Sequence, residues 1–188
     1  MRTPRLKASP GQPLAYYHCY SHVTGGVLPF DPSTRNVFIS FMRSYEDFCA
    51  VAILTFSVMS NHFHILAEVA ARPAFLPPDE ELLRRCARIY SETRMRGITR
   101  MFKHLPRGSS HGDNYRKQFF DRMHDVSQFM KELKQRFAQW YNYEGPHRRK
   151  GVFWAQRFGS TLIEGTIDAV QAMAAYIDLN PEIGRAHV

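Results

Sequence analysis

The order of apolar and polar residues along the chain predicts a small set of strands and helices. Residues 15–23 are aromatic and prone to β structure. Residues 51–59 and 62–69 are apolar runs separated by a two-residue turn, which predicts a β-hairpin. Residues 31–48 and 125–142 instead repeat their apolar side chains at helical spacing, and Ser33 is the expected N-cap of the first of these helices.

The C-terminal part of the sequence adds one strand and one helix. The segment 152–165 contains a strand pattern centred on 157–164. Residues 166–181 follow with a helical pattern, for which Thr166 is the expected cap and Pro181 the expected end. The resulting order, β-α-β-β, insertion, α-β-α, predicts an α+β fold whose mostly antiparallel central sheet has helices packed on one face.

Residues 72–124 differ in character from the rest and predict a basic, mostly helical insertion within a single domain that spans residues 1–188. Three prolines mark a break in 71–80, a strong helical pattern covers 78–95, and 104–114 has the composition of a polar loop. The insertion holds 12 Lys and Arg against 6 Asp and Glu. It therefore carries a large share of the positive charge of the chain.

The charge of the whole chain indicates a polyanionic partner, for which nucleic acid is the first candidate. The net charge is +8, and residues 131–158 hold 7 Lys and Arg against 2 Asp and Glu. No apolar segment is long enough to predict a membrane span, and the N-terminus lacks the pattern of a secretory signal. The three scattered cysteines fit buried thiols in a reducing cytosol, so we expect a cytoplasmic, nucleoid-associated protein.

Two histidines one residue apart interrupt the apolar run "SVMSNHFHIL". Side chains alternate between the faces of a strand, so His62 and His64 are expected on one face, with Phe63 and Ile65 directed into a core. Two neighbouring neutral imidazoles can provide half of a divalent-metal site. The same pattern also fits two histidines on a solvated sheet face.

A second pair of polar side chains lies on the last predicted helix. Tyr176 and Asn180 are four residues apart, so they occupy neighbouring positions on one helical face. A tyrosine can supply an attacking oxygen, and an amide can supply an oxygen ligand for a metal. Taken alone, the pair also fits a tyrosine at the margin of the core and an asparagine near a helix end.

The motifs "VMSNHFHIL" and "AAYIDLNP" together resemble those of the single-tyrosine HUH transposases, in particular the REP-associated tyrosine transposases of the IS200-like group. That family carries H-U-H, with U apolar, and later Y-I-x-x-N-P. The segments "YYHCYSH", "MKELKQRFAQWYN" and "GVFWAQRF" agree with the resemblance. It implies a ferredoxin-like or RRM-like HUH nuclease core. It also implies a transposase that cuts single-stranded DNA next to a hairpin, such as a REP-like palindrome, through a covalent 5′-phosphotyrosine.

The resemblance also implies a role for each motif residue. Tyr176 matches the nucleophile, and His62, His64 and Asn180 match the positions that bind a divalent metal, Mg²⁺ or Mn²⁺. Relatives of this kind act as monomers or homodimers. The cations and aromatic residues between the last two predicted helices are further expected to bind DNA, because single strands are held by phosphate contacts and base stacking. These residues are Arg148, Arg149, Lys150, Trp154 and Arg157.

Three alternatives to a transposase can be compared with the same residues. A histidine-triad nucleotide hydrolase would need a third alternate histidine where Leu66 stands. A two-histidine phosphoesterase would need two H-x-[ST] motifs. His22-Val23-Thr24 fits one of them, whereas the motif that starts at His62 ends in His64. A domesticated DNA-binding module that has lost cleavage stays open.

Overall fold

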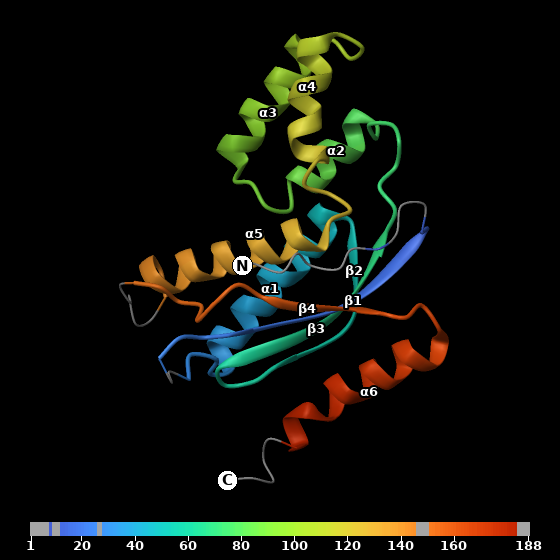
Figure 1. Ribbon diagram of the computed structural model, residues 1–188. Helices are drawn as coiled ribbons and strands as arrows, with labels where there is room; N and C mark the ends of the chain where they lie inside the picture. Colours follow the sequence, from blue (N-terminus) through green and yellow to red (C-terminus); the bar gives the residue numbers. More distant parts are fainter. Residues whose placement is uncertain (1–7, 9–11, 26–27, 146–150, 184–188) are drawn as a thin grey trace, which may run out of the picture.

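The computed structural model describes residues 8, 12–25, 28–145 and 151–183, which form one antiparallel sheet, six helices and their connections (Figure 1). The strands are β1 (Leu14–His22), β2 (Val51–Val58), β3 (His62–Ala70) and β4 (Gly159–Ile163). Their order in the sheet is β2-β3-β1-β4, and every neighbouring pair is antiparallel. The predicted α+β class with an antiparallel sheet is thereby confirmed.

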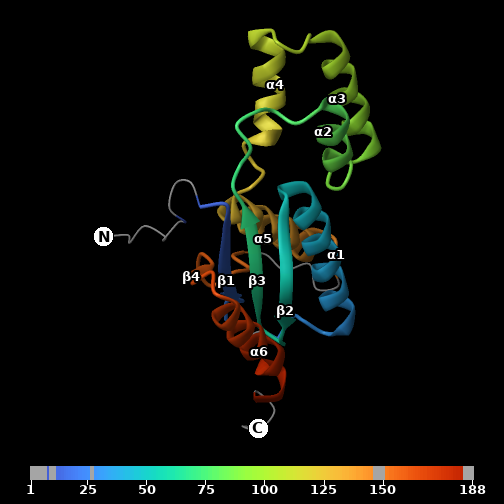
Figure 2. The ribbon, with the colours of Figure 1, turned by 90° about the vertical axis from the view of Figure 1, so that its right-hand side faces the viewer.

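The helices lie on both faces of the sheet, which corrects the expectation that they share one face. The helices of the core are α1 (Pro32–Cys49), α5 (Val126–Tyr143) and α6 (Ile167–Ile183). Figure 2 shows α6 in front of the strands and α5 behind them. The reason is that the sheet carries apolar side chains on both faces: Leu66 of β3 and Ile163 of β4 bury Ile177 of α6 on the face away from α5.

Aromatic side chains fill the core between the sheet, α1 and α5. The predicted apolar stripe of α5 is buried there, as are Phe63 and Ile65 of β3. The Phe38 ring of α1 lies 4.7 Å from Phe63 and 5.1 Å from Phe137 between ring centroids. Cys19, Cys49 and Cys86 are buried free thiols, as expected. None of the helices in the described ranges combines the length and apolar character that a membrane crossing requires.

The N-cap of α1 is Asp31 rather than the expected Ser33. The Asp31 carboxylate accepts the backbone N–H of Thr34 at 2.8 Å. This hydrogen bond and one from Ser33 hold the pKa of Asp31 below its usual range. Ser33 lies inside the helix and donates its hydroxyl to Asp31. Pro32 at the first helical position explains the difference, because proline favours that position and leaves the preceding residue as the cap.

The insertion contains three helices where the sequence predicted one long helix and a loop. These are α2 (Asp79–Cys86), α3 (Glu92–His104) and α4 (Ser110–Phe120). The continuous helix expected over 78–95 is wrong because Ser91 caps a new helix, accepting the backbone N–H of Arg94. The polar loop expected over 104–114 is also shorter, since Ser109 caps α4 by accepting the N–H of Gly112 at 3.0 Å.

Apolar contacts and ion pairs join the insertion to the core. Leu82, Cys86 and Phe119 belong to the same buried cluster as the side chains beneath the sheet. Just after α4, Arg122 pairs with Glu132 of α5 at 2.5 Å, and its guanidinium lies 4.4 Å from the Phe48 ring centroid. Both side chains are largely buried. This ion pair therefore fixes the insertion at its C-terminal connection.

Glu132→Ala should destabilise the fold by about 2–3 kcal/mol, between the values for exposed and fully buried pairs, because it leaves the Arg122 guanidinium without its carboxylate. The measurement is the free energy of unfolding in urea. Glu144→Ala is the matched control, since Glu144 pairs with Arg136 at the surface. A loss of equal size in both variants would contradict a structural role for the Arg122–Glu132 pair.

Candidate active site

The sheet face that α6 covers carries a cluster of histidines from two neighbouring strands. His18, Tyr20 and His22 alternate along β1 and share this face, and His62 and His64 share it on β3. The register pairs His22 with His62 and Tyr20 with His64. Strand pairing therefore brings four imidazoles together, of which the sequence analysis used only two as site residues.

Hydrogen bonds orient the imidazoles of this cluster. His18 Nε2 lies 2.8 Å from His64 Nδ1, and both side chains are buried. His62 Nδ1 lies 2.7 Å from Asn61 Oδ1, so the amide oxygen can accept the Nδ1–H. The rings of His22 and His62 stack with their centroids 4.7 Å apart. Each of the two motif histidines thus has its Nδ1 engaged, which leaves Nε2 as the nitrogen able to bind a further group.

Burial keeps His18, His62 and His64 neutral at physiological pH. It lowers the pKa of His18 and of His62, and His22 lowers that of His62 further. Burial, together with the neighbouring His18, lowers the pKa of His64 to about 4. A neutral imidazole has a free lone pair, which is the form that ligates a metal ion.

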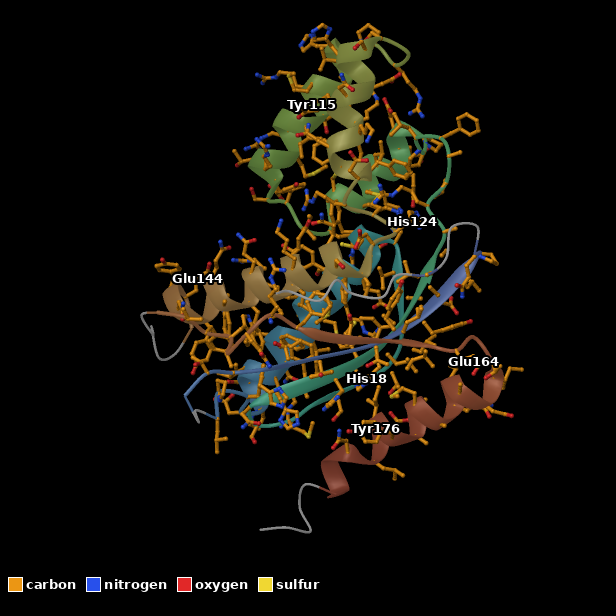
Figure 3. All side chains as sticks on the ribbon, in the orientation of Figure 1. His18, Tyr115, His124, Glu144, Glu164 and Tyr176 are labelled. Atoms are coloured by element: carbon orange, nitrogen blue, oxygen red, sulfur yellow. The ribbon has the colours of Figure 1, made fainter. Side chains whose placement is uncertain are left out.

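Tyr176 reaches this cluster from α6. Ile177, the next residue, is fully buried against Leu66 and Ile163, whereas the Tyr176 side chain is 48% exposed. The Tyr176 ring centroid lies 6.0 Å from that of His18 and 6.1 Å from that of His64, with both pairs edge to face. Figure 3 shows Tyr176 beside His18 under the sheet. The histidines and the tyrosine of one chain therefore meet at one place, with the hydroxyl-bearing ring open to solvent.

A pocket of about 580 Å³ adjoins the cluster between β2, α1 and α6. Its wall includes His62, Ile177 and Asp178, and Asp178 accepts a hydrogen bond from Thr55 of β2. Arg35 of α1 also lines the pocket, and its Nε is buried without a hydrogen-bond partner in the described structure. The pocket thus offers a cation and an imidazole to an incoming group.

Asn180, the third residue that the sequence motifs assign to a metal site, lies on α6. Asn180 lies one turn beyond Tyr176 and is partly exposed, and its side-chain amide forms no hydrogen bond with other described residues. The helix continues past it to Ile183, so Pro181 does not end α6 as predicted. Proline at this position removes one backbone donor but still permits the helical backbone. Within the described ranges, no three His, Cys, Asp or Glu side chains are arranged to hold a metal ion. A metal site here would therefore need the Asn180 amide or other oxygen donors.

Trp154 is a core residue rather than an exposed surface for base stacking. Only 9% of it is exposed, its indole N–H donates to the Lys134 carbonyl at 2.9 Å, and the Lys134 ammonium lies 5.0 Å from its ring centroid. The indole therefore packs in the core, and the prediction that a base stacks on it is wrong for this arrangement. Arg157 is exposed, and Arg148, Arg149 and Lys150 lie outside the described residues.

His18, Tyr20 and Arg35 lie at the site although the sequence motifs did not predict them. The signal for the first two was the alternation in "YYHCYSH", because an antiparallel partner of the histidine strand must bring one such face beside the motif histidines. Tyr20 also explains Gly159 on β4, since a Cβ there would lie 2.3 Å from the tyrosine ring. Nothing in the sequence distinguishes Arg35 from the other arginines.

The metal-free protein should lose stability as the pH falls from 7 to 5. A histidine whose pKa is lower in the folded protein than in the unfolded chain, where it is 6.5, contributes stability above pH 6.5. This contribution is lost as the pH falls from 6.5 toward the pKa of the folded protein. For His64, with a folded pKa of about 4, the loss is about 2 kcal/mol at pH 5. Urea unfolding at both pH values measures it. His64→Asn should reduce the pH dependence, whereas His104→Asn, an exposed position on α3, should not. An unchanged dependence in His64→Asn would contradict a buried neutral imidazole.

The family described as "Transposase IS200 like" matches residues 113–180 of the chain. The matched range includes α5, β4 and both Tyr176 and Asn180, but it begins after His62 and His64. Strand pairing and the docking of α6 are what bring the histidines to the matched segment. No curated protein matches the sequence.

A solved REP-associated tyrosine transposase bound to a REP hairpin has a similar fold, with a TM-score of 0.54, 14% sequence identity, and coverage of 98% of this chain and 74% of that one. A candidate transposase from Deinococcus radiodurans R1 has 17% identity over 64% of this chain and all of its own, with a TM-score of 0.30. The resemblance inferred from the sequence motifs is thus confirmed: the chain matches the IS200-like transposases over residues 113–180 and shares the fold of a REP-associated tyrosine transposase.

Proposed function

We propose that the chain is a metal-dependent single-strand DNA endonuclease and strand transferase that acts at hairpin-forming sequences through a covalent 5′-phosphotyrosine. The observation that carries this proposal is the meeting of the exposed Tyr176 with His18 and His64 on one face of the sheet. The match to the IS200-like transposases includes the tyrosine, and the solved transposase of similar fold is bound to a REP hairpin.

Tyr176 is the proposed nucleophile. Its exposed ring is held by the buried Ile177, so that a phosphodiester can approach the hydroxyl without displacing core side chains. The tyrosine oxygen attacks the phosphorus and loses its proton, and the bond from phosphorus to the 3′ oxygen breaks. The departing oxygen takes up a proton and becomes a free 3′-OH. Because the phosphodiester energy is retained in the phosphotyrosine, another 3′-OH can reverse the linkage without a nucleotide cofactor.

His62, His64 and Asn180 are the residues proposed to hold the metal, Mg²⁺ or Mn²⁺. Their donor set of two neutral imidazole nitrogens and one amide oxygen suits a divalent ion with positions left open for phosphate and water. The Nδ1 contacts of both histidines leave Nε2 as the nitrogen able to bind the ion, as in ligating imidazoles whose other nitrogen is hydrogen-bonded. When bound, the ion would polarise the scissile phosphate and offset charge in the transition state.

Basic side chains beside the C-terminal end of β1 are proposed to hold the single-stranded DNA. A pocket of about 450 Å³ is lined by the exposed Lys131 and Arg157 and by no acidic residue. Lys134 also lines it but is buried and donates to the Gln156 carbonyl at 2.9 Å. The segment that leads to Arg157 is joined to this end of β1, since the Ala155 N–H donates to the His22 carbonyl at 3.0 Å. DNA bound in the pocket would therefore run toward the histidine cluster. Arg148, Arg149 and Lys150, which lie outside the described residues, stay proposed DNA contacts on the sequence alone.

Tyr176→Phe should abolish the covalent adduct while leaving DNA affinity nearly unchanged, because it removes one hydroxyl and little volume. The measurement is a denaturant-resistant band between the protein and a labelled single-stranded hairpin oligonucleotide with Mg²⁺ or Mn²⁺. Tyr20→Phe is the control, since Tyr20 is the other tyrosine close to His64 and should not be needed. An adduct that survives in Tyr176→Phe and disappears in Tyr20→Phe would assign the nucleophile to Tyr20. Hairpin binding without an adduct in the unmodified protein would favour the DNA-binding module that lacks cleavage.

His18→Leu should weaken Mn²⁺ binding by about 10- to 100-fold, the usual effect of removing a residue that orients a metal ligand. His18 Nε2 can accept the Nδ1–H of His64, which fixes the tautomer with its lone pair on Nε2. His18→Gln is the matched variant, because its amide oxygen can still accept the hydrogen bond and should restore much of the affinity. Calorimetric titration of the metal-free proteins measures the effect, with thermal unfolding as the check on folding. Equal Mn²⁺ affinity in all three proteins would contradict an orienting role for His18.

A further inference from the structure

The cations of the insertion divide into two groups with different surroundings. Most of those around α2 and α4 form ion pairs that join the insertion to α1, to α5 or to itself. Arg84 and Arg88 pair with Asp47 of α1 at 3.1 and 3.0 Å, and Arg116, itself buried, pairs with Asp79 at 2.6 Å. The other members of this paired group are Arg72, Arg85, Arg107, Lys117 and Arg122. These side chains already have a structural role.

The second group lies on α3 and has no carboxylate partner among the described residues. The group comprises Arg94, Arg96, Arg100 and Lys103, all of them exposed. Arg96, Arg100 and Lys103 follow one another at spacings of four and three residues. They occupy the helix face opposite the buried Ile98 and Phe102. We call these three cations the α3 stripe. Lys103 in the last turn interacts favourably with the helix dipole, but Arg96 and Arg100 in the middle of the helix gain nothing from it.

Gly97 is a second unusual feature on the exposed side of α3. A Cβ at this position would meet no atom within 4 Å, so the packing of the protein does not require a glycine there. Glycine is also less favourable than alanine in an exposed helix interior. A glycine that the fold itself does not need is suited to the close approach of another molecule to the helix backbone.

We infer that the α3 stripe is a second DNA-contacting surface, which binds the phosphate backbone of a duplex. The stripe spans about 10 Å along the helix, which is about three base-pair steps of a DNA duplex. It offers long cationic side chains and no exposed aromatic ring, so it provides phosphate contacts but no platform on which unpaired bases could stack. That chemistry fits a duplex backbone better than a single strand.

The α3 stripe is far from the catalytic tyrosine. Figures 1 and 2 show the insertion at one end of the molecule and α6 at the other, with the sheet, α1 and α5 between them. The duplex bound on α3 is therefore separate from the strand presented to Tyr176. This inference rests on the proposed function, which makes DNA the partner of the protein. It does not depend on the chemistry of the tyrosine.

The test compares binding of a hairpin oligonucleotide with a long duplex stem by the unmodified protein and by a triple variant, Arg96→Ala with Arg100→Ala and Lys103→Ala. Each lost phosphate contact lowers the slope of log affinity against log salt by about 0.9 for a duplex. The slope is expected to fall by about 2 to 3 and the affinity at low salt by at least about 100-fold. Adduct formation at saturating DNA should be unchanged, because the stripe is remote from Tyr176.

The matched control removes the same charge from ion-paired surface positions, as Arg43→Ala with Lys117→Ala and Arg136→Ala. A second variant, Gly97→Glu, replaces glycine with a better helix former and adds opposite charge beside the stripe, so it should weaken stem binding at least tenfold without lowering the melting temperature. An unchanged salt slope in the triple variant would overturn the inference. An equal fall of the salt slope in the control would also overturn it, because net charge alone would then explain the effect. Preferential binding of the stripe to anionic lipid vesicles would overturn it too.

The two proposals fail in different ways in this experiment. A lower salt slope in the triple variant, with no adduct in any protein, would support the α3 surface and contradict the cleavage function. A normal adduct in every protein, with an unchanged slope, would retain the cleavage function and remove the α3 surface.

Discussion

The two-residue period of β1 and β3 places the core side chains on one face of the sheet and the histidine cluster on the other. Alternate residues of β3 place Phe63, Ile65 and Ala67 under α1 and α5, while His62 and His64 face α6. A slip of one residue in the pairing of β1 with β3 would exchange the two sets and place imidazoles in an aromatic core. Burying unpaired polar rings there would cost several kcal/mol, so the hydrophobic core itself fixes the register that assembles the histidine cluster.

The same register also explains why the cluster is larger than the motif. β1 is a central strand, paired with β3 on one side and β4 on the other, so each face of β1 must match those of both neighbours. His18 and His22 therefore share their face with the motif histidines, and His18 supplies the hydrogen-bond partner of His64. A histidine pair on a solvated strand would titrate near its usual pKa. Here the partners and the burial hold the imidazoles in the neutral form that a metal requires.

The sequence predicted those parts of the structure that depend on local pattern. The strand of His62 and His64, the apolar stripe of α5 and the Thr166 cap, which accepts the Ala169 N–H at 3.3 Å, all follow from spacing and propensity. Features that depend on tertiary contacts were missed. The break between α2 and α3 requires Ser91 to compete with a good helical pattern, and the face covered by α6 depends on a small patch around Leu66. No local pattern reports that a distant arginine such as Arg35 borders the site.

Tyr176 and the insertion show how neighbouring residues divide the tasks of holding the fold and meeting a ligand. On α6, Ile177 anchors the helix while Tyr176 stays exposed, so the reactive group can be available without loosening the core. Asp47 of α1 and Glu132 of α5 neutralise arginines that join the insertion to the core, and Asp79 neutralises Arg116 within the insertion. No such ion pair is formed by the cations of α3 among the described residues. A basic segment in sequence is therefore a mixture, and only the side chains without an acidic partner add to the field that attracts a polyanion. A count of charge along residues 72–124 therefore overstates the charge available to a ligand, whereas the ion pairs of the fold show that the unpaired cations of the described insertion lie on α3.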